Sequence, residues 1–160
     1  MLSYVQGVLT SFHHSRPNKP QHQPYPQVKV TYGEKAQYAT ADDNSQPLSP
    51  IGKKIIQEVT GTFLYYARAI DAIMLPALDS LETQQAAPTE NTMTLVKQFI
   101  DYAATHPDAI IMYHASDMVL SAHSNTSYLS ESKARIRAGG HFSCQTTHPF
   151  RLSEGARLYR

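Results

Sequence analysis

The amino-acid sequence predicts an α+β fold, in which a helical region is followed by a small antiparallel sheet. Apolar residues recur at spacings of three and four between residues 51 and 105, which is typical of amphipathic helices. After Pro107 this spacing gives way to the alternation expected of half-buried strands. The hydrophobic fraction of 41% supplies enough apolar side chains for a modest core.

The first part of the chain combines a short helix with a long irregular stretch. Residues 2–13 are expected to form an amphipathic helix, which ends before Pro17 because proline cannot continue it. Its apolar face would consist of Val5, Val8, Leu9 and Phe12. Residues 16–50 are rich in proline and glutamine and lack a helical period, so we expect an extended linker that follows the surface. A loop of this length favours a connection between modules.

The strongest helix prediction covers residues 51–69. Ser49 suits the N-cap and Pro50 suits the first turn, where a missing amide hydrogen costs nothing. Gly61 interrupts the helix at a cost of about 1 kcal/mol relative to alanine. An interior glycine of this kind often permits close packing of a neighbour, which we expect here.

Two further helices are predicted after it. One covers about residues 71–84, where Pro76 either kinks the helix or sets its start. The other covers residues 90–105, with Thr89 as its N-cap and Pro107 as its stop.

Strands are expected in the last third of the chain. Residues 109–114 and 118–124 are predicted to pair through a tight turn near residues 116–117. After a polar loop, residues 138–144 would add a third strand. The pattern is then lost, so residues 145–160 are expected to form a disordered tail.

Composition excludes several classes of protein. The 14 Lys and Arg residues nearly balance the 13 Asp and Glu residues, so any contact with nucleic acid requires a local basic patch. No apolar run is long enough to span a membrane, and the start lacks the pattern of a secretory signal. The single cysteine, Cys144, indicates a reducing compartment, so an intracellular location, cytoplasmic or nuclear, is expected. We expect this thiol to be partly buried, and Cys144 with His148 lacks the motif of a thiol nucleophile.

Three stretches, taken in order, carry a family resemblance. The first is residues 4–12 (YVQGVLTSF), the second is residues 59–67 (VTGTFLYYA), and the third joins residues 122–128 (AHSNTSY) to residues 133–140 (KARIRAGG). Together they resemble the C-terminal part of copia-type LTR-retrotransposon Pol polyproteins. In that family the stretches are similar to a late reverse-transcriptase helix, the helix between polymerase and RNase H, and the first RNase H strand with its basic loop.

The resemblance implies a truncated polyprotein with five parts. Residues 1–15 would be a remnant of the late reverse-transcriptase helix, residues 16–50 the linker, and residues 51–106 a helical connection region. Residues 107–144 would be the start of an incomplete RNase H-like fold, and residues 145–160 the tail.

The resemblance also implies that this chain catalyses nothing by itself. The leading metal-binding aspartate of the family falls on Asn125, and the remaining carboxylates would lie beyond the chain. A neutral amide cannot bridge two divalent metals as a carboxylate does. The paired aspartates of a polymerase are missing, and Asp42 and Asp43, which lie in the linker, are expected to be solvated. No catalytic residue, metal site or cofactor is therefore expected; Mg²⁺ would belong only to a complete family member.

The candidate binding residues are Lys133, Arg135 and Arg137, which alternate along the chain. In an extended loop all three would lie on one side and contact phosphates in a sequence-neutral way. The resemblance implies that the weak partner is an RNA–DNA hybrid or another nucleic acid. A solvated loop is the alternative. Three hypotheses remain open: an inert fragment, a remnant module that binds nucleic acid or a protein partner, and an active nuclease.

Histidines offer a further possibility. His13 and His14 are adjacent, and an exposed helix end explains them better than a zinc site, which prefers helical spacing and more ligands. His114, His123 and His141 would come together across neighbouring strands, as metal ligands or simply as polar strand positions.

Overall fold

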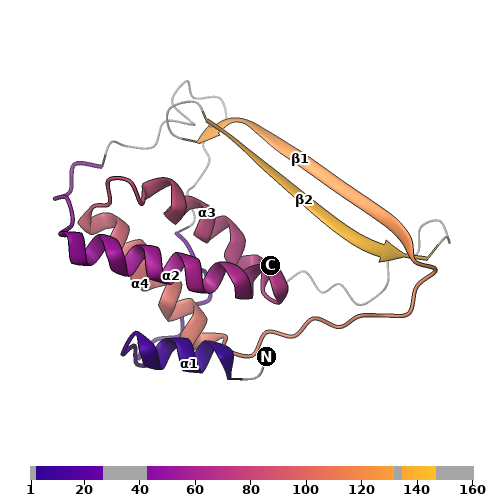
Figure 1. Ribbon diagram of the computed structural model, residues 1–160, viewed down its shortest axis with the longest axis horizontal. Helices are drawn as coiled ribbons and strands as arrows, with labels where there is room; N and C mark the ends of the chain where they lie inside the picture. Colours follow the sequence, from indigo (N-terminus) through magenta and orange to yellow (C-terminus); the bar gives the residue numbers. More distant parts are fainter. Residues whose placement is uncertain (1–2, 27–42, 132–134, 147–160) are drawn as a thin grey trace. The chain divides into compact units, whose positions relative to one another are not determined.

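The computed structural model describes residues 3–26, 43–131 and 135–146. Its elements, in chain order, are α1 (Tyr4–Ser11), α2 (Pro50–Ala69), the 3₁₀ helix η1 (Ala72–Met74), α3 (Leu75–Gln84), α4 (Glu90–Thr105), β1 (Val119–Glu131) and β2 (Arg135–Gln145) (Figure 1). The helices form one compact unit and the two strands belong to another. Helices together with a small antiparallel sheet confirm the α+β class.

The two long helices begin at the residues that the sequence indicates. The Ser49 hydroxyl accepts a hydrogen bond from the Gly52 amide at 3.3 Å, and Pro50 occupies the first turn of α2. At α4, the Thr89 hydroxyl accepts from the Thr92 amide and the Thr92 hydroxyl accepts from the Thr89 amide. This reciprocal capping box satisfies amide groups that have no partner within the helix.

The predicted helix over residues 71–84 is divided. The Asp71 carboxylate accepts a hydrogen bond from the Ile73 amide at 3.2 Å and caps the short helix η1. Pro76 lies in the first turn of α3, so the proline marks the start of that helix and does not kink a longer one.

The core of the helical unit lies between α2, α3 and α4, with α1 packed against it through Val5 and Leu9. Phe63 and Phe99 meet edge to face at its centre, with ring centroids 5.1 Å apart and an angle of 88°. The largest fully buried side chains are Tyr66, Phe63, Phe99, Ile56, Met74, Leu78, Val5, Val59 and Val96. Burying them supplies the main driving force for folding of this unit.

Gly61 does not receive a packed neighbour. It is exposed on α2, and a Cβ atom built there would meet nothing within 4 Å. The expectation of close packing at this glycine was therefore wrong.

In two described parts, the proline-rich stretch lies against the helical unit and forms no helix. The Gln21 amide donates to the Thr105 hydroxyl at 3.0 Å, and the Gln98 side chain donates to the Gln23 carbonyl at 3.2 Å. Further along, Pro47 forms an isolated bridge with Thr89. Residues 27–42 lie outside the described residues.

The hairpin differs from the sheet that the sequence predicts. Residues 109–114 form no strand, and the expected strands over residues 118–124 and 138–144 are parts of the longer β1 and β2, which pair antiparallel. The Ser116 hydroxyl accepts from the Met118 amide at 3.3 Å, which makes a local turn but joins no strands. The strand prediction over residues 109–114 failed because an apolar segment becomes a strand only where a partner supplies hydrogen bonds.

Alternation gives the hairpin two unlike faces. Positions 121, 123 and 125 share one face, which is polar, while Leu120 and Phe142 belong to the other, where they are 69% and 71% exposed. Residues 147–160, where the disordered tail was expected, lie outside the described residues. Within the described ranges, no helix is both long and apolar enough to cross a membrane.

Candidate functional site

Asn125 occupies the middle of β1, directly opposite Gly139 in β2. Its side-chain oxygen accepts a hydrogen bond from the Thr126 amide at 2.9 Å. That oxygen is neutral and is already used by the backbone next to it, so it is a poor ligand for a hard divalent cation.

The basic residues predicted to bind nucleic acid fall mostly within β2, where a polar loop was expected. In the strand register, Arg137 is paired with Ser127 and Arg135 with Glu131. The pairing is irregular between these two residue pairs. The side chains of Arg135 and Arg137 lie outside the described residues. Lys133 lies outside the described residues.

The structure brings together two of the three strand histidines. His123 and His141 stand directly opposite each other in the hairpin, and His123 Nε2 lies 3.1 Å from the Ser121 hydroxyl. His114 precedes the hairpin and belongs to no strand. In the part of the chain that the structure describes, no three His, Cys, Asp or Glu side chains are grouped to hold a metal ion.

Cys144 is exposed on β2, which corrects the expectation of a partly buried thiol. It pairs with Leu120 in the register and so shares the apolar face of the hairpin.

Two histidines hold the segment after α1 against α4, a feature that sequence reasoning missed. His14 Nε2 lies 2.8 Å from a carboxylate oxygen of Asp101, so His14 is more than the exposed end of a helix. Farther along, His22 Nδ1 lies 3.0 Å from His106 Nε2, and one ring donates its N–H to the other. Both contacts join residues more than 80 positions apart, and no local pattern predicts them.

A buried carboxyl group lies near the same end of α4. Asp71 is 5% exposed, and it accepts a hydrogen bond from the Tyr102 hydroxyl at 3.3 Å. Burial raises the pKa of Asp71 above its ordinary value, although hydrogen bonds from Ile73 and Tyr102 and the nearby His106 oppose this shift. Burial, followed by the charge of Asp71, also raises the pKa of Tyr102.

A cleft of about 370 Å³ opens beside this carboxyl group. Asp71, Tyr102, His106 and Asp108 contribute to its lining. A carboxyl group, a phenol and an imidazole thus share one small concave surface, which sequence reasoning did not identify because these residues come from separate elements.

Asp43 is the described member of the acidic pair in the linker. It is exposed, as expected, but it accepts hydrogen bonds from the Ser45 amide and hydroxyl and from the Thr89 hydroxyl. The Ser45 hydroxyl, followed by that of Thr89, lowers the pKa of Asp43 from 3.8 to about 2. This carboxylate therefore belongs to the cap of α4.

The chain matches no model of a known protein family, no curated protein sequence and no solved structure.

Proposed function

We propose that this chain is a fragment of a copia-type retrotransposon polyprotein that catalyses nothing by itself. In this proposal the helical unit corresponds to the connection between reverse transcriptase and RNase H. The hairpin corresponds to the start of an RNase H-like sheet.

The contact between the first two stretches of the resemblance carries the proposal. The Tyr4 hydroxyl donates to the Thr62 carbonyl at 3.0 Å, and the Tyr4 ring stacks on that of Tyr66. Residues 4–12 and 59–67, which the sequence separates by a long linker, thus belong to one packed unit. This arrangement supports the idea that both stretches derive from one ancestral module.

The chemistry of Asn125 supports the absence of catalysis. RNase H cleavage uses two divalent metals held by carboxylates, which activate water and stabilise the leaving oxygen. The amide oxygen of Asn125 carries no charge and accepts from the Thr126 amide. Replacement by aspartate restores one carboxylate only, and no group of three potential metal ligands is found among the described residues.

The test is a cleavage assay on a labelled RNA–DNA hybrid with Mg²⁺ or Mn²⁺. We expect no product from the native protein or from Asn125→Asp, and circular dichroism should show both to be folded. Asn125→Ala serves as the matched control for contaminating nuclease, because its background should equal that of the other two. Metal-dependent cleavage by the native protein that exceeds this background would overturn the proposal.

A second candidate function is weak, sequence-neutral binding of nucleic acid, which the placement of Arg135 and Arg137 in one strand favours. Contacts of basic side chains with phosphates do not depend on base sequence and weaken as salt rises.

Fluorescence anisotropy of a labelled hybrid at low and moderate salt tests this function. Replacing Lys133, Arg135 and Arg137 with alanine should weaken binding and reduce the logarithmic salt slope by about 2–3, because each phosphate contact contributes about 0.9. A control variant, Arg16→Ala/Lys19→Ala/Arg68→Ala, removes the same charge from exposed positions in the helical unit. If the two variants lost the same affinity, the binding would reflect overall charge and not these three residues. If the native protein did not bind the hybrid at low salt, the nucleic-acid-binding function would be excluded.

A further inference from the structure

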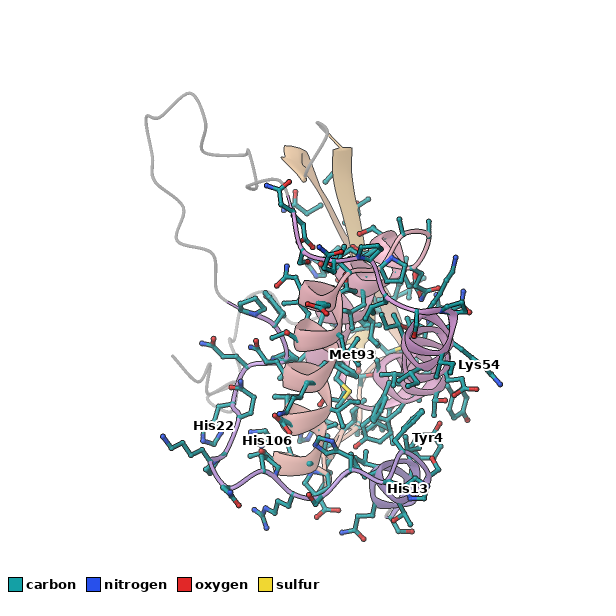
Figure 2. The ribbon with its side chains drawn as sticks, turned by 90° about the vertical axis from the view of Figure 1, so that its left-hand side faces the viewer. Tyr4, His13, His22, Lys54, Met93 and His106 are labelled. Atoms are coloured by element: carbon teal, nitrogen blue, oxygen red, sulfur yellow. The ribbon has the colours of Figure 1, made fainter. Side chains whose placement is uncertain are left out.

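We propose that His22 and His106 form a site for a divalent transition-metal ion of the class that prefers imidazole ligands, such as Cu²⁺, Ni²⁺ or Zn²⁺. Figure 2 shows the two side chains next to each other near the C-terminal end of α4. Neither histidine is among the residues on which the proposed function rests.

The separation of the two nitrogens fits a shared metal. Metal–nitrogen bonds of about 2.0–2.1 Å, at angles between a right angle and a tetrahedral one, place two ligand nitrogens roughly 2.9–3.3 Å apart. His22 Nδ1 and His106 Nε2 are 3.0 Å apart, and their ring centroids are separated by 5.1 Å. Both rings must rotate out of the hydrogen-bonded arrangement to turn their lone pairs towards one ion.

Hydrogen bonds hold the backbone at His106 and next to His22. The His106 amide donates to the Tyr102 carbonyl at 2.9 Å, and the His106 ring lies 5.0 Å from that of Tyr102. On the other side, the hydrogen bond from the Gln21 amide to Thr105 fixes the residue before His22. Ligands that are fixed before binding lose little entropy when the ion arrives.

A metal ion can replace the hydrogen bond between the two rings without any net loss or gain of protons. Without metal, one imidazole donates its N–H to the other nitrogen. When the ion binds, that ring carries its proton on its remaining nitrogen, so both rings stay neutral and each offers one lone pair. No oxidation or reduction is involved.

The proposed site has only two protein ligands, and this number limits its expected affinity for the metal ion. Among the described residues no third side chain of ligand type joins the pair in a metal-binding group, so water completes the coordination shell. Binding should be weaker than at protein sites with three or four ligands, and it should follow the order Cu²⁺ above Ni²⁺ and Zn²⁺. A bound ion would fasten the segment containing His22 to the end of α4.

Thermal unfolding of the untagged full chain, followed by the helical circular-dichroism signal, tests the site with Ni²⁺ as the probe. An ion that binds only the folded state should raise Tm by roughly 5 °C at ten times its Kd. We expect the rise in the native protein and its loss in His22→Gln and His106→Gln. Mg²⁺ should give no rise, because it prefers oxygen ligands.

The histidine pair of the hairpin supplies the matched control. The variant His123→Gln/His141→Gln removes two opposed imidazoles from the other unit and should keep the Ni²⁺-dependent rise. As a second readout, electron paramagnetic resonance of this variant with Cu²⁺ should show two nitrogen ligands, reduced to one on adding His22→Gln. A native protein whose Tm does not change up to millimolar Ni²⁺, or a rise that survives His22→Gln, would overturn the proposal.

Discussion

The ring of Tyr4 stacks on the ring of Tyr66, with centroids 5.6 Å apart and an angle of 4° between their planes. Together with the hydrogen bond from the Tyr4 hydroxyl to the Thr62 carbonyl, this contact fastens α1 to α2. Helix α1 has only eight residues, and a helix of that length is not stable alone in water. Its structure therefore depends on such tertiary contacts.

Replacing Tyr4 with phenylalanine should lower the free energy of unfolding by about 0.5–1.5 kcal/mol, because the ring stays but the hydrogen bond to Thr62 is lost. Urea denaturation followed by circular dichroism measures the change. The control is Tyr65→Phe, at a neighbouring tyrosine that is 58% exposed, where we expect a smaller loss. Equal losses at the two positions would show that the Tyr4 hydrogen bond contributes no special stability.

Gly61→Ala should raise the free energy of unfolding by about 0.5–1 kcal/mol. The added methyl group meets no atom within 4 Å, so the gain in helix propensity is not offset by a clash. The matched substitution is Gly52→Ala in the same helix, where the new Cβ would lie 3.4 Å from two side-chain atoms of Leu48. Its gain should be smaller, and a larger gain at Gly52 would contradict this account.

The sequence predicts the helices well because their signals are local. Ser49 and Thr89 mark two helix starts by side-chain hydrogen bonds to amides three residues away. Pro76 is ambiguous from sequence, since a proline suits a helix start and also a kink. The position of Asp71, which caps the preceding turn, settles that ambiguity in favour of a start.

Features that depend on distant partners could not be predicted in the same way. The apolar run at residues 109–114 has the composition of a strand, but β1 pairs with β2 instead. The contact between His22 and His106 and the hydrogen bond between Tyr102 and Asp71 join residues from different elements. For the candidate site, the sequence indicates which residue types are present, and only the fold shows which of them meet.

Asp71 should make the stability of the helical unit depend on pH. Its pKa is raised in the folded protein, so between the unfolded and folded pKa values the native state binds more protons than the unfolded state. The contribution of Asp71 is therefore most favourable below the ordinary value of 3.8, and it falls as pH rises through the raised pKa. Urea denaturation from pH 3.5 to 7 measures this dependence.

Asp71→Asn removes the titrating group but keeps an oxygen that accepts from Ile73 and Tyr102. We expect the variant to gain stability relative to the native protein as pH rises across this window. The control is Asp108→Asn, at an exposed carboxyl group that lines the same cleft. A constant difference between Asp71→Asn and the native protein at every pH would show that Asp71 does not titrate abnormally.

Asp43 should titrate in the opposite direction. NMR titration of its carboxyl carbon should give a pKa of about 2, well below 3.8, because hydroxyl groups donate to the ionised form. Its stabilising contribution should be present above pH 3.8 and be lost as pH falls through about 2. Ser45→Ala removes the largest cause and should raise the pKa markedly, whereas Asn91→Ala removes the smallest and should raise it little. If both variants left the pKa unchanged, the low value would have to come from the positive end of the α4 dipole and not from these side chains.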